Sequence, residues 1–171
     1  MLKMVLNTAM GASLALACAT AALAEDMAAP QGDVLLTVSG DIDVTNVGDT
    51  LQLDREQLAA LGMTSFETTT IWSDGIQTYE GTSLAALAEL LGLTEGKILA
   101  TAINDYTVEI PVSDAVEGGP IIAVLMNGQE MSVRDKGPLW IVYPYDSNKD
   151  YRSEVVYSRS IWQLDRIEVI R

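Results

Sequence analysis

The stretch Pro120-Ile-Ile-Ala-Val-Leu-Met126 is apolar at every position, and Asn127-Gly128 follows it directly. A continuous apolar run of this length is typical of a strand that is buried on both faces of its sheet. Asn-Gly is a dipeptide that strongly favours a tight turn. The sequence therefore predicts a buried strand at 120–126 that ends in a turn.

Shorter strands are expected on both sides of this segment, because β-branched and apolar runs alternate with turn residues. The expected strands are 33–39, 42–45, 51–53, 66–72, 97–103, 106–110, 139–143 and 166–170. Polar turns or loops are expected at 40–41, 47–49, 73–75 and 104–105.

Two helices are predicted from their capping residues. Asp54, with Gln57 three residues later, forms an acid-capped capping box, and this helix is expected to stop at Gly62. Ser83 precedes the clearest helical pattern, in which leucines recur on one face up to Gly92. Many short strands, two or three helices and no regular β-α-β alternation predict a mixed, β-rich α+β domain.

Residues 1–24 have the composition of a cleavable signal peptide. Lys3 precedes an apolar segment, and Ala22-Leu23-Ala24 forms an A-x-A cleavage site. Cys18, the one cysteine of the chain, lies inside this segment. Lipidation at Cys18 is the less favoured alternative, because Ala15 stands where a branched aliphatic residue is preferred. Both alternatives predict export, and the apolar run is too short to favour insertion in the membrane.

Residues 25–32 are small, polar and Pro/Gly-bearing, so we expect a flexible leader there. Residues 33–171 are enough for a single domain with its own core. The chain has no histidine, and beyond residue 24 it has no cysteine. That composition excludes a disulfide, a thiolate nucleophile, a Ser-His-Asp triad and a Cys/His metal site from this domain.

The chain is acidic, with 24 Asp and Glu against 10 Lys and Arg, which argues against nucleic-acid or anionic-lipid partners. The charge is uneven, because residues 25–133 contain two basic residues and residues 134–171 contain seven. Two interpretations stay open, a less acidic face and a local anion pocket. The residues of such a pocket would be Arg134, Lys136, Arg152 and Arg159.

Three polar segments hold candidate ligand-binding residues. Trp72 precedes Ser73-Asp74-Gly75, where an indole can stack on a flat ligand or simply border the core. The turn at 104–106 places an amide, a carboxylate and an aromatic ring together, although an ordinary Asn/Asp turn explains the same pattern. Further along, Arg159 points either to solvent or into a cleft, and Trp162 is assigned to the core.

Six segments occur in an informative order. They are Tyr79-Glu-Gly-Thr-Ser-Leu84, Asp105-Tyr-Thr-Val-Glu-Ile-Pro111, Asn127-Gly-Gln129, Lys136-Gly-Pro-Leu-Trp140, Arg159-Ser-Ile-Trp162 and Arg166-Ile-Glu-Val169. Together they resemble the sulfite-oxidase-type molybdopterin-binding domain. The resemblance covers residues 33–171 and implies the β-rich α+β fold of that family.

Two departures from the family bear on function. Its enzymes include sulfite oxidases and periplasmic methionine-sulfoxide reductases, in which a cysteine four residues before a tryptophan binds molybdenum. Thr68 stands at that position here, and a hydroxyl is a poor substitute for a thiolate on this metal. Trp140 replaces an arginine that helps to hold the cofactor phosphate in the family. Both departures favour a smaller, neutral, aromatic ligand.

The chain also resembles a small subgroup of this family that lacks the cysteine and binds free pterins in the periplasm. Those proteins act as sensors on the periplasmic part of membrane diguanylate cyclase or phosphodiesterase proteins. The resemblance implies a periplasmic pterin sensor with no catalytic residue, no metal site and no tightly bound cofactor. One alternative is a molybdopterin-dependent oxidoreductase subunit without the cysteine ligand. Another is a scaffold for a membrane protein that needs no ligand.

A pterin presents its 2-amino group and N3–H as two donors in line, which one carboxylate can accept as a pair. An aromatic side chain would stack on the ring, and an arginine would donate to the ring carbonyl. The candidate ligand-binding residues are Trp72, Asp74, Asp105, Tyr106, Arg134, Arg159 and Ser160.

Overall fold

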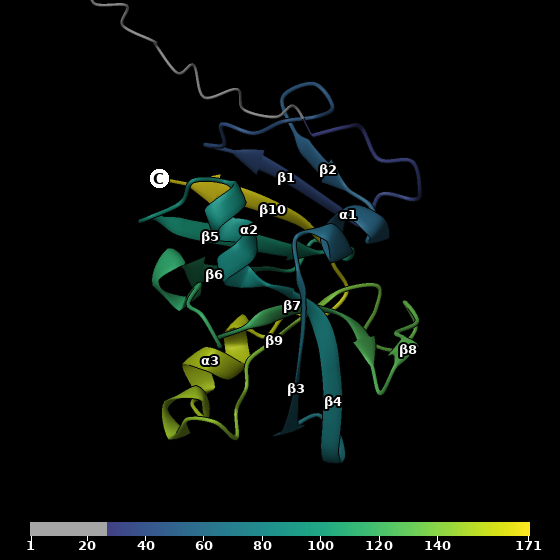
Figure 1. The fold of residues 1–171 in the computed structure, drawn as a ribbon. Helices are drawn as coiled ribbons and strands as arrows, with labels where there is room; N and C mark the ends of the chain where they lie inside the picture. Colours follow the sequence, from purple (N-terminus) through teal and green to yellow (C-terminus); the bar gives the residue numbers. More distant parts are fainter. Residues whose placement is uncertain (1–26) are drawn as a thin grey trace, which may run out of the picture.

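The computed structural model describes residues 27–171 (Figure 1). The expected signal peptide and the first two residues of the expected leader lie outside the described residues. Within them, the strands are β1 Leu36–Gly40, β2 Leu51–Leu53, β3 Met63–Thr70, β4 Ser73–Ser83, β5 Lys97–Ala102, β6 Thr107–Pro111, β7 Ile121–Met126, β8 Gln129–Glu130, β9 Trp140–Val142 and β10 Leu164–Ile170. The helices are α1 Arg55–Ala60, α2 Leu84–Leu90 and α3 Glu154–Arg159, with short 3-10 turns at Val112–Asp114 and Lys149–Tyr151.

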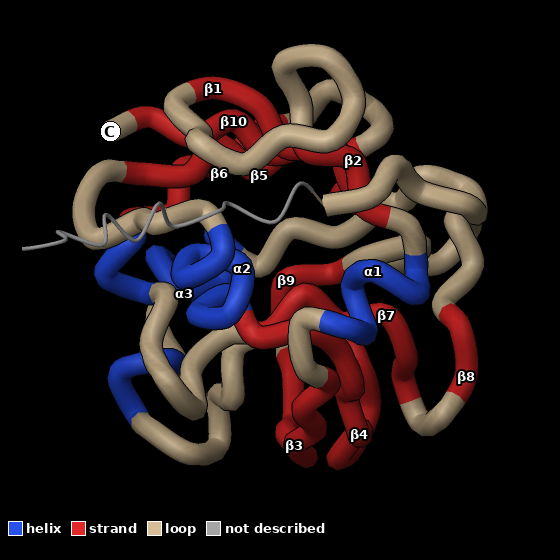
Figure 2. The backbone as a smooth tube through the Cα atoms, turned by 45° about the horizontal axis from the view of Figure 1, so that its top comes forward, coloured by secondary structure: helices blue, strands red, loops and turns tan. Residues whose placement is uncertain are grey.

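The strands form two sheets, which confirms a mixed, strand-rich α+β fold. The first has the order β2-β1-β10-β5-β6, with β10 parallel to β1 and antiparallel to β5. The second has the order β3-β4-β7-β8, and β9 also pairs with β7. Figure 2 shows the two groups of strands one above the other, with α1 and α2 between them. One hydrophobic cluster contains buried residues from both sheets.

The predicted buried strand at 120–126 is β7, and its first four residues are all buried. It lies between β4 and β9, so both of its edges are hydrogen-bonded. Its apolar sequence suits this place, because neither face of the strand meets water. The expected turn at Asn127-Gly128 is present, with Asn127 at a positive φ of 53°, and it leads into β8, a strand that the sequence did not indicate.

Both predicted helices are present. The capping box of α1 is complete, since the amide of Gln57 donates to Asp54 Oδ1 at 2.9 Å and the amide of Asp54 donates to Gln57 Oε1 at 3.1 Å. Ser83 caps α2 by accepting from the amide of Ala86 at 3.0 Å. The third helix, α3, was not located in the sequence, although Ser153 caps it.

Three local predictions were wrong. Residues 42–45 form no strand, because the amide of Ile42 turns back to the carbonyl of Gly40 and the segment has no partner strand. The strand predicted at 66–72 begins earlier and ends at Thr70, so Trp72 lies in the turn. Residues 73–75 are not a loop but the start of β4. Asp74, Gly75 and Ile76 are consecutive exposed residues, so the start of this strand lacks the alternation that is typical of a half-buried strand.

The described part of the expected leader, residues 27–32, has no regular structure but is attached to the domain. The amides of Gln31 and Gly32 both donate to Asp54 Oδ2 at 2.9 Å. Gln57 Nε2 also donates to the carbonyl of Ala28 at 2.6 Å. The N-cap of α1 therefore fixes both a helix and the segment that enters the domain. Among residues 27–171, no helix is both long and apolar enough to cross a lipid bilayer.

This double use of Asp54 predicts a pH-dependent stability. Hydrogen bonds from the backbone of Gln57 and then Gly32 hold the pKa of Asp54 below its usual value of 3.8. Such a carboxylate stabilises the fold above its unfolded pKa, and this contribution is lost as the pH falls through the folded pKa. The variant Asp54→Asn should therefore be less stable than the natural protein at neutral pH. Its urea midpoint should also fall less steeply between about pH 5 and pH 2. Equal slopes for both proteins would contradict this role.

Candidate functional site

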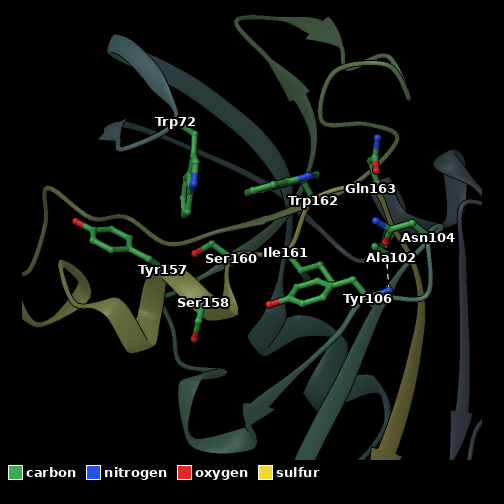
Figure 3. Close-up of a pocket in the computed structure, with 10 residues that line it drawn as sticks. All are labelled: Trp72, Ala102, Asn104, Tyr106, Tyr157, Ser158, Ser160, Ile161, Trp162 and Gln163. Atoms are coloured by element: carbon green, nitrogen blue, oxygen red, sulfur yellow. Dashed lines mark hydrogen bonds between the residues drawn. The ribbon is translucent and has the colours of Figure 1, made fainter.

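A pocket of about 260 Å³ opens where three segments that are distant in the sequence meet (Figure 3). They are the turn between β3 and β4, the turn between β5 and β6, and the segment from the end of α3 to the start of β10. The lining residues are Trp72, Ala102, Asn104, Tyr106, Tyr157, Ser158, Ser160, Ile161, Trp162 and Gln163. Four of these ten are aromatic, so the pocket offers flat apolar walls.

Backbone hydrogen bonds bring these segments together. The amide of Ile103 donates to the carbonyl of Gln163 at 2.9 Å, which attaches the β5–β6 turn to the segment before β10. Asp105 and Gln163 both adopt a positive φ, at 67° and 53°, and so turn the chain sharply at the pocket. The carbonyl of Tyr106 accepts from the amide of Ala102 at 2.8 Å, which closes the β5–β6 turn.

Trp72 occupies the two-residue turn between β3 and β4. Its amide donates to Thr70 Oγ1 at 3.1 Å, and that hydroxyl lies 2.7 Å from Ser73 Oγ. The indole meets Trp162 and Tyr157 edge to face, with ring centroids 5.6 Å and 5.7 Å away. Edge-to-face pairs of this kind add to the apolar packing. The turn therefore holds one aromatic wall of the pocket in a fixed position.

Trp140 lies behind this wall rather than in the pocket. It is 0% exposed, and its ring centroid is 5.9 Å from that of Trp72 and 6.4 Å from that of Trp162. Its indole N–H donates to the carbonyl of Ser160 at 3.2 Å. Trp140, which the sequence resemblance would set in the place of an arginine, thus supports two pocket residues and does not itself line the pocket.

The polar groups of the pocket are neutral. Asn104 Oδ1 accepts from the amide of Tyr106 at 3.2 Å, and Gln163 Nε2 donates to the carbonyl of Val133 at 2.6 Å. Within residues 27–171, Asn104 Nδ2 and Gln163 Oε1 make no hydrogen bond, so one donor group and one acceptor remain for a ligand. Among the described residues, no charged side chain lines the pocket.

Ser160 is fixed by its own hydrogen bonds. Its hydroxyl accepts from the phenol of Tyr145 at 2.6 Å and donates to the carbonyl of Val156 at 2.9 Å. Burial raises the pKa of Tyr145 well above its usual value, so this phenol stays a neutral donor. Ser160 is buried, so its hydroxyl, already engaged as donor and acceptor, shapes the pocket wall.

Three of the predicted site residues, Trp72, Tyr106 and Ser160, line the pocket together. The two predicted carboxylates do not. Asp105 forms an ion pair with Arg166 Nη2 at 2.6 Å on the outside of the turn. Asp74 lies exposed near the start of β4. Neither predicted carboxylate therefore lines this pocket. At the β5–β6 turn the ring of Tyr106 lines it, whereas the carboxylate of Asp105 pairs with Arg166 outside it.

The predicted arginines also lie elsewhere. Arg159 Nη1 donates to Asp114 Oδ2 at 2.9 Å, and the phenol of Tyr143 donates to the same oxygen at 2.7 Å. Burial and then this carboxylate raise the pKa of Tyr143 well above its usual value. Arg134 is exposed and does not line the pocket. Arg159 therefore joins the end of α3 to the Val112–Asp114 turn and is not free to bind a ligand there.

The four residues of the suggested anion pocket have separate surroundings. Arg152 pairs with Asp146, and Arg159 pairs with Asp114. Lys136 Nζ lies 5.3 Å from the ring centroid of Trp162 and 5.4 Å from that of Trp140. This contact stabilises the two indoles by cation–π attraction. The near-neutral C-terminal third is therefore better described as a less acidic face.

Sequence reasoning missed several lining residues. Trp162 was assigned to the core, but 37% of it is exposed and it lines the pocket. Tyr157 and Ser158 belong to α3, a helix that the sequence pattern does not indicate, so no site was predicted there. A signal was present in Ser153, whose hydroxyl caps α3 through the amide of Val156.

Thr68, which the sequence resemblance would set at the position of a metal-binding cysteine, is buried in β3 and does not line the pocket. Its hydroxyl accepts from the amide of Asp146 at 3.1 Å and donates to the carbonyl of Thr69 at 3.2 Å. Thr68 therefore joins β3 to the segment after β9. Comparisons of the chain with protein-family models and with curated proteins gave no match.

Proposed function

We propose that the protein is a periplasmic, non-catalytic binding protein for a free pterin or a related flat heteroaromatic compound. The observation that carries this proposal is the pocket in which Trp72, Tyr106 and Trp162 surround the free amide groups of Asn104 and Gln163. Aromatic walls with a few fixed polar groups are typical of sites for small ligands. Figure 3 shows Trp162 and Tyr106 on opposite sides of the opening, with Trp72 and Tyr157 toward one end.

The neutral amides replace the carboxylate that we expected to read the pterin edge. Gln163 Oε1 would accept from the 2-amino group or N3–H, and Asn104 Nδ2 would donate to the ring carbonyl. The cavity of about 260 Å³ lies just below the usual range of ligand pockets, about 300–1,000 Å³, which suits a bicyclic ring without a large substituent. Stacking on aromatic side chains contributes about 1–3 kcal/mol per base in nucleic-acid sites, so micromolar affinity is expected.

The residues present do not fit the complete molybdenum cofactor. Thr68 is buried with its hydroxyl already hydrogen-bonded, and Trp140 is buried where the family has a phosphate-binding arginine. The described residues that line the pocket supply no cation for a phosphate group. We therefore propose that a sulfite-oxidase-like fold serves here as a scaffold for a free pterin. The alternative is a molybdopterin-dependent oxidoreductase subunit.

The proposal includes a sensor role toward the periplasmic region of a membrane protein of cyclic-di-GMP signalling. Exposed apolar side chains around the pocket opening support it. Ile103 and Val133 lie beside it, because both backbones hydrogen-bond to Gln163, and both side chains are exposed. Tyr106 and Trp162 extend this surface into the pocket. A partner protein that covers the opening would therefore make different contacts with the ligand-bound pocket and with the empty pocket.

A fluorescence titration tests the proposal. Because two of the three tryptophans line the pocket, a stacked reduced pterin should quench tryptophan emission in a saturable way with a micromolar midpoint. No change in emission up to millimolar dihydropterin and tetrahydropterin would contradict pterin binding. Stoichiometric molybdenum in protein from a molybdenum-competent host would favour the alternative.

Tyr106 allows binding to be separated from stability, because 59% of it is exposed although it lines the pocket. The variant Tyr106→Ala should lower pterin affinity by roughly fivefold to a hundredfold, the loss of one stacking partner. Its thermal midpoint should stay close to that of the natural protein. Asp105→Asn is the matched control, since this neighbouring carboxylate pairs with Arg166 outside the pocket, and it should leave affinity unchanged. A stronger effect for the Asp105 variant would contradict the site.

A further inference from the structure

The free edge of β3 has unused backbone hydrogen-bonding groups, and β3 is the outer strand of its sheet (Figure 1). Glu67 lies opposite Thr78 of β4. Thr78 exchanges both of its backbone hydrogen bonds with Asn127, at 3.0 Å and 2.8 Å, so its groups point away from β3. Two residues that lie opposite each other in an antiparallel pair are either both hydrogen-bonded to each other or both turned away from each other. The N–H and C=O of Glu67 must therefore point away from β4.

Thr69 gives the same result independently. Its amide donates to Asp146 Oδ2 at 2.7 Å, on the side of β3 that faces away from β4. Backbone groups alternate along a strand, so Ser65 and Glu67 also direct theirs to the free edge. None of the hydrogen bonds found among residues 27–171 uses those groups of Ser65 or Glu67. Asp146 thus closes one end of the edge and leaves the rest open.

A groove of about 510 Å³ borders this open edge at Thr64, Ser65 and Phe66. Thr64, Ser65 and Phe66 of β3 form one side, and the first turns of α2 form another with Ala85 and Ala86. Glycines 118 and 119 and Ser147 complete much of the rest. Ser65, the two alanines, the two glycines and Ser147 are small, which lets another backbone approach closely at those positions. Natural proteins usually protect such edges with charged residues, proline, a bulge or a short strand. β3 is eight residues long and has no lysine or proline, one charged residue, Glu67, and an irregularity only near its end at Thr69/Thr70.

The charge of the groove indicates the occupant. Glu89 and Glu117 line it, and no lysine or arginine is among the described residues that do. Glu67 adds an acidic side chain on the edge itself. Two copies of this edge would bring like charges together, which destabilises directly opposed pairs. A positively charged segment would instead gain both the backbone ladder and the charge attraction.

We propose that this groove binds an extended, basic peptide segment of a partner protein, which adds to β3 as a further strand. In this mode, main-chain hydrogen bonds supply affinity and side-chain contacts supply specificity. The outward groups of Ser65 and Glu67 would form the new ladder, and basic side chains of the partner would meet Glu89 and Glu117. The site uses no residue of the aromatic pocket, so it stands or falls independently of the pterin.

The probe is the hexapeptide Lys-Val-Lys-Val-Lys-Val, acetylated, amidated and fluorescently labelled, and its binding is followed by polarisation. We expect saturable binding to the full protein. The same peptide with N-methylated amides should bind at least about tenfold more weakly, because it cannot donate to the edge. Equal affinity for both peptides would mean that charge alone accounts for binding and would overturn the proposal. Failure to bind at millimolar peptide would overturn it as well.

Two variants locate the binding to this edge. Ser65→Pro removes an outward N–H that β4 does not use, a place where edge strands tolerate proline. Glu89→Lys reverses a charge inside the groove without touching the ladder. Each variant should lower the affinity for the peptide by about tenfold or more. Glu95→Lys, the same change on an exposed loop, should leave that affinity unchanged. Undiminished binding to Glu89→Lys would contradict the site even if Ser65→Pro failed to fold. A dimer in sedimentation that Ser65→Pro abolishes would assign the edge to a second copy and overturn the basic-peptide proposal.

Discussion

Replacing Trp72 with alanine is expected to lower pterin affinity by at least about tenfold, because a wall of the pocket and its stacking surface are lost together. The same change should lower the free energy of unfolding by about 3 kcal/mol, the low end for such truncations, since the indole is only partly buried. The physical reason is shared by both effects. Trp72 meets Trp140, Tyr145, Tyr157 and Trp162, each with a ring centroid within 6.3 Å.

The two effects are separated with Trp72→Phe, which keeps an apolar ring in the turn. This variant should recover much of the stability, while its smaller stacking area recovers only part of the affinity. Urea unfolding gives the free energy of unfolding, and calorimetric titration of the folded variants gives affinity. A destabilised Trp72→Ala protein with unchanged pterin affinity would show that Trp72 belongs to the core alone.

The second large effect is expected at Trp140. Trp140→Ala should lower the free energy of unfolding by roughly 4–5 kcal/mol, near the top of the range for buried aromatic truncations. The side chain is 0% exposed, its ring centroid lies 5.3 Å from that of Tyr79, and its indole N–H is hydrogen-bonded to Ser160. The truncation leaves a cavity and an unpaired carbonyl in the core.

Trp162→Ala is the matched control for Trp140, because both indoles contact Trp72 and Lys136 but Trp162 is 37% exposed. Urea unfolding should show a clearly smaller loss of stability for Trp162→Ala than for Trp140→Ala. Trp162→Ala should lower pterin affinity directly, because Trp162 lines the pocket and Trp140 does not. Equal destabilisation by the two variants would contradict the division between a supporting indole and a pocket indole.

The sequence predicted those elements whose signals are local. β7 is apolar throughout because both of its faces are covered, and Asp54 and Ser83 act as caps within three residues of themselves. β4 was missed because its first half contains the exposed residues Asp74, Gly75 and Ile76 and shows no alternation of buried and exposed positions. Residues 42–45 alternate like a strand but form none, because alternation alone supplies no partner strand.

Of the predicted site residues, the structure brings the aromatic ones into the pocket and leaves the charged ones outside it. Trp72 and Tyr106 could be predicted because each is an aromatic residue beside a turn, and the position of a turn is set by nearby residues. The direction of a charged side chain depends on distant partners instead. Asp105 is held by Arg166, 61 residues away, and Arg159 by Asp114, 45 residues away. No spacing in the sequence reports such pairs, so the neutral character of the pocket emerged only from the structure.

The most direct test of the central claim is a calorimetric titration of the purified protein with tetrahydropterin. A single neutral pocket with aromatic walls predicts one pterin per chain, micromolar affinity, and loss of that binding in Tyr106→Ala but not in Asp105→Asn. Absence of heat and of saturation at millimolar pterin, or equal weakening in both variants, would contradict the assignment of this pocket to a pterin.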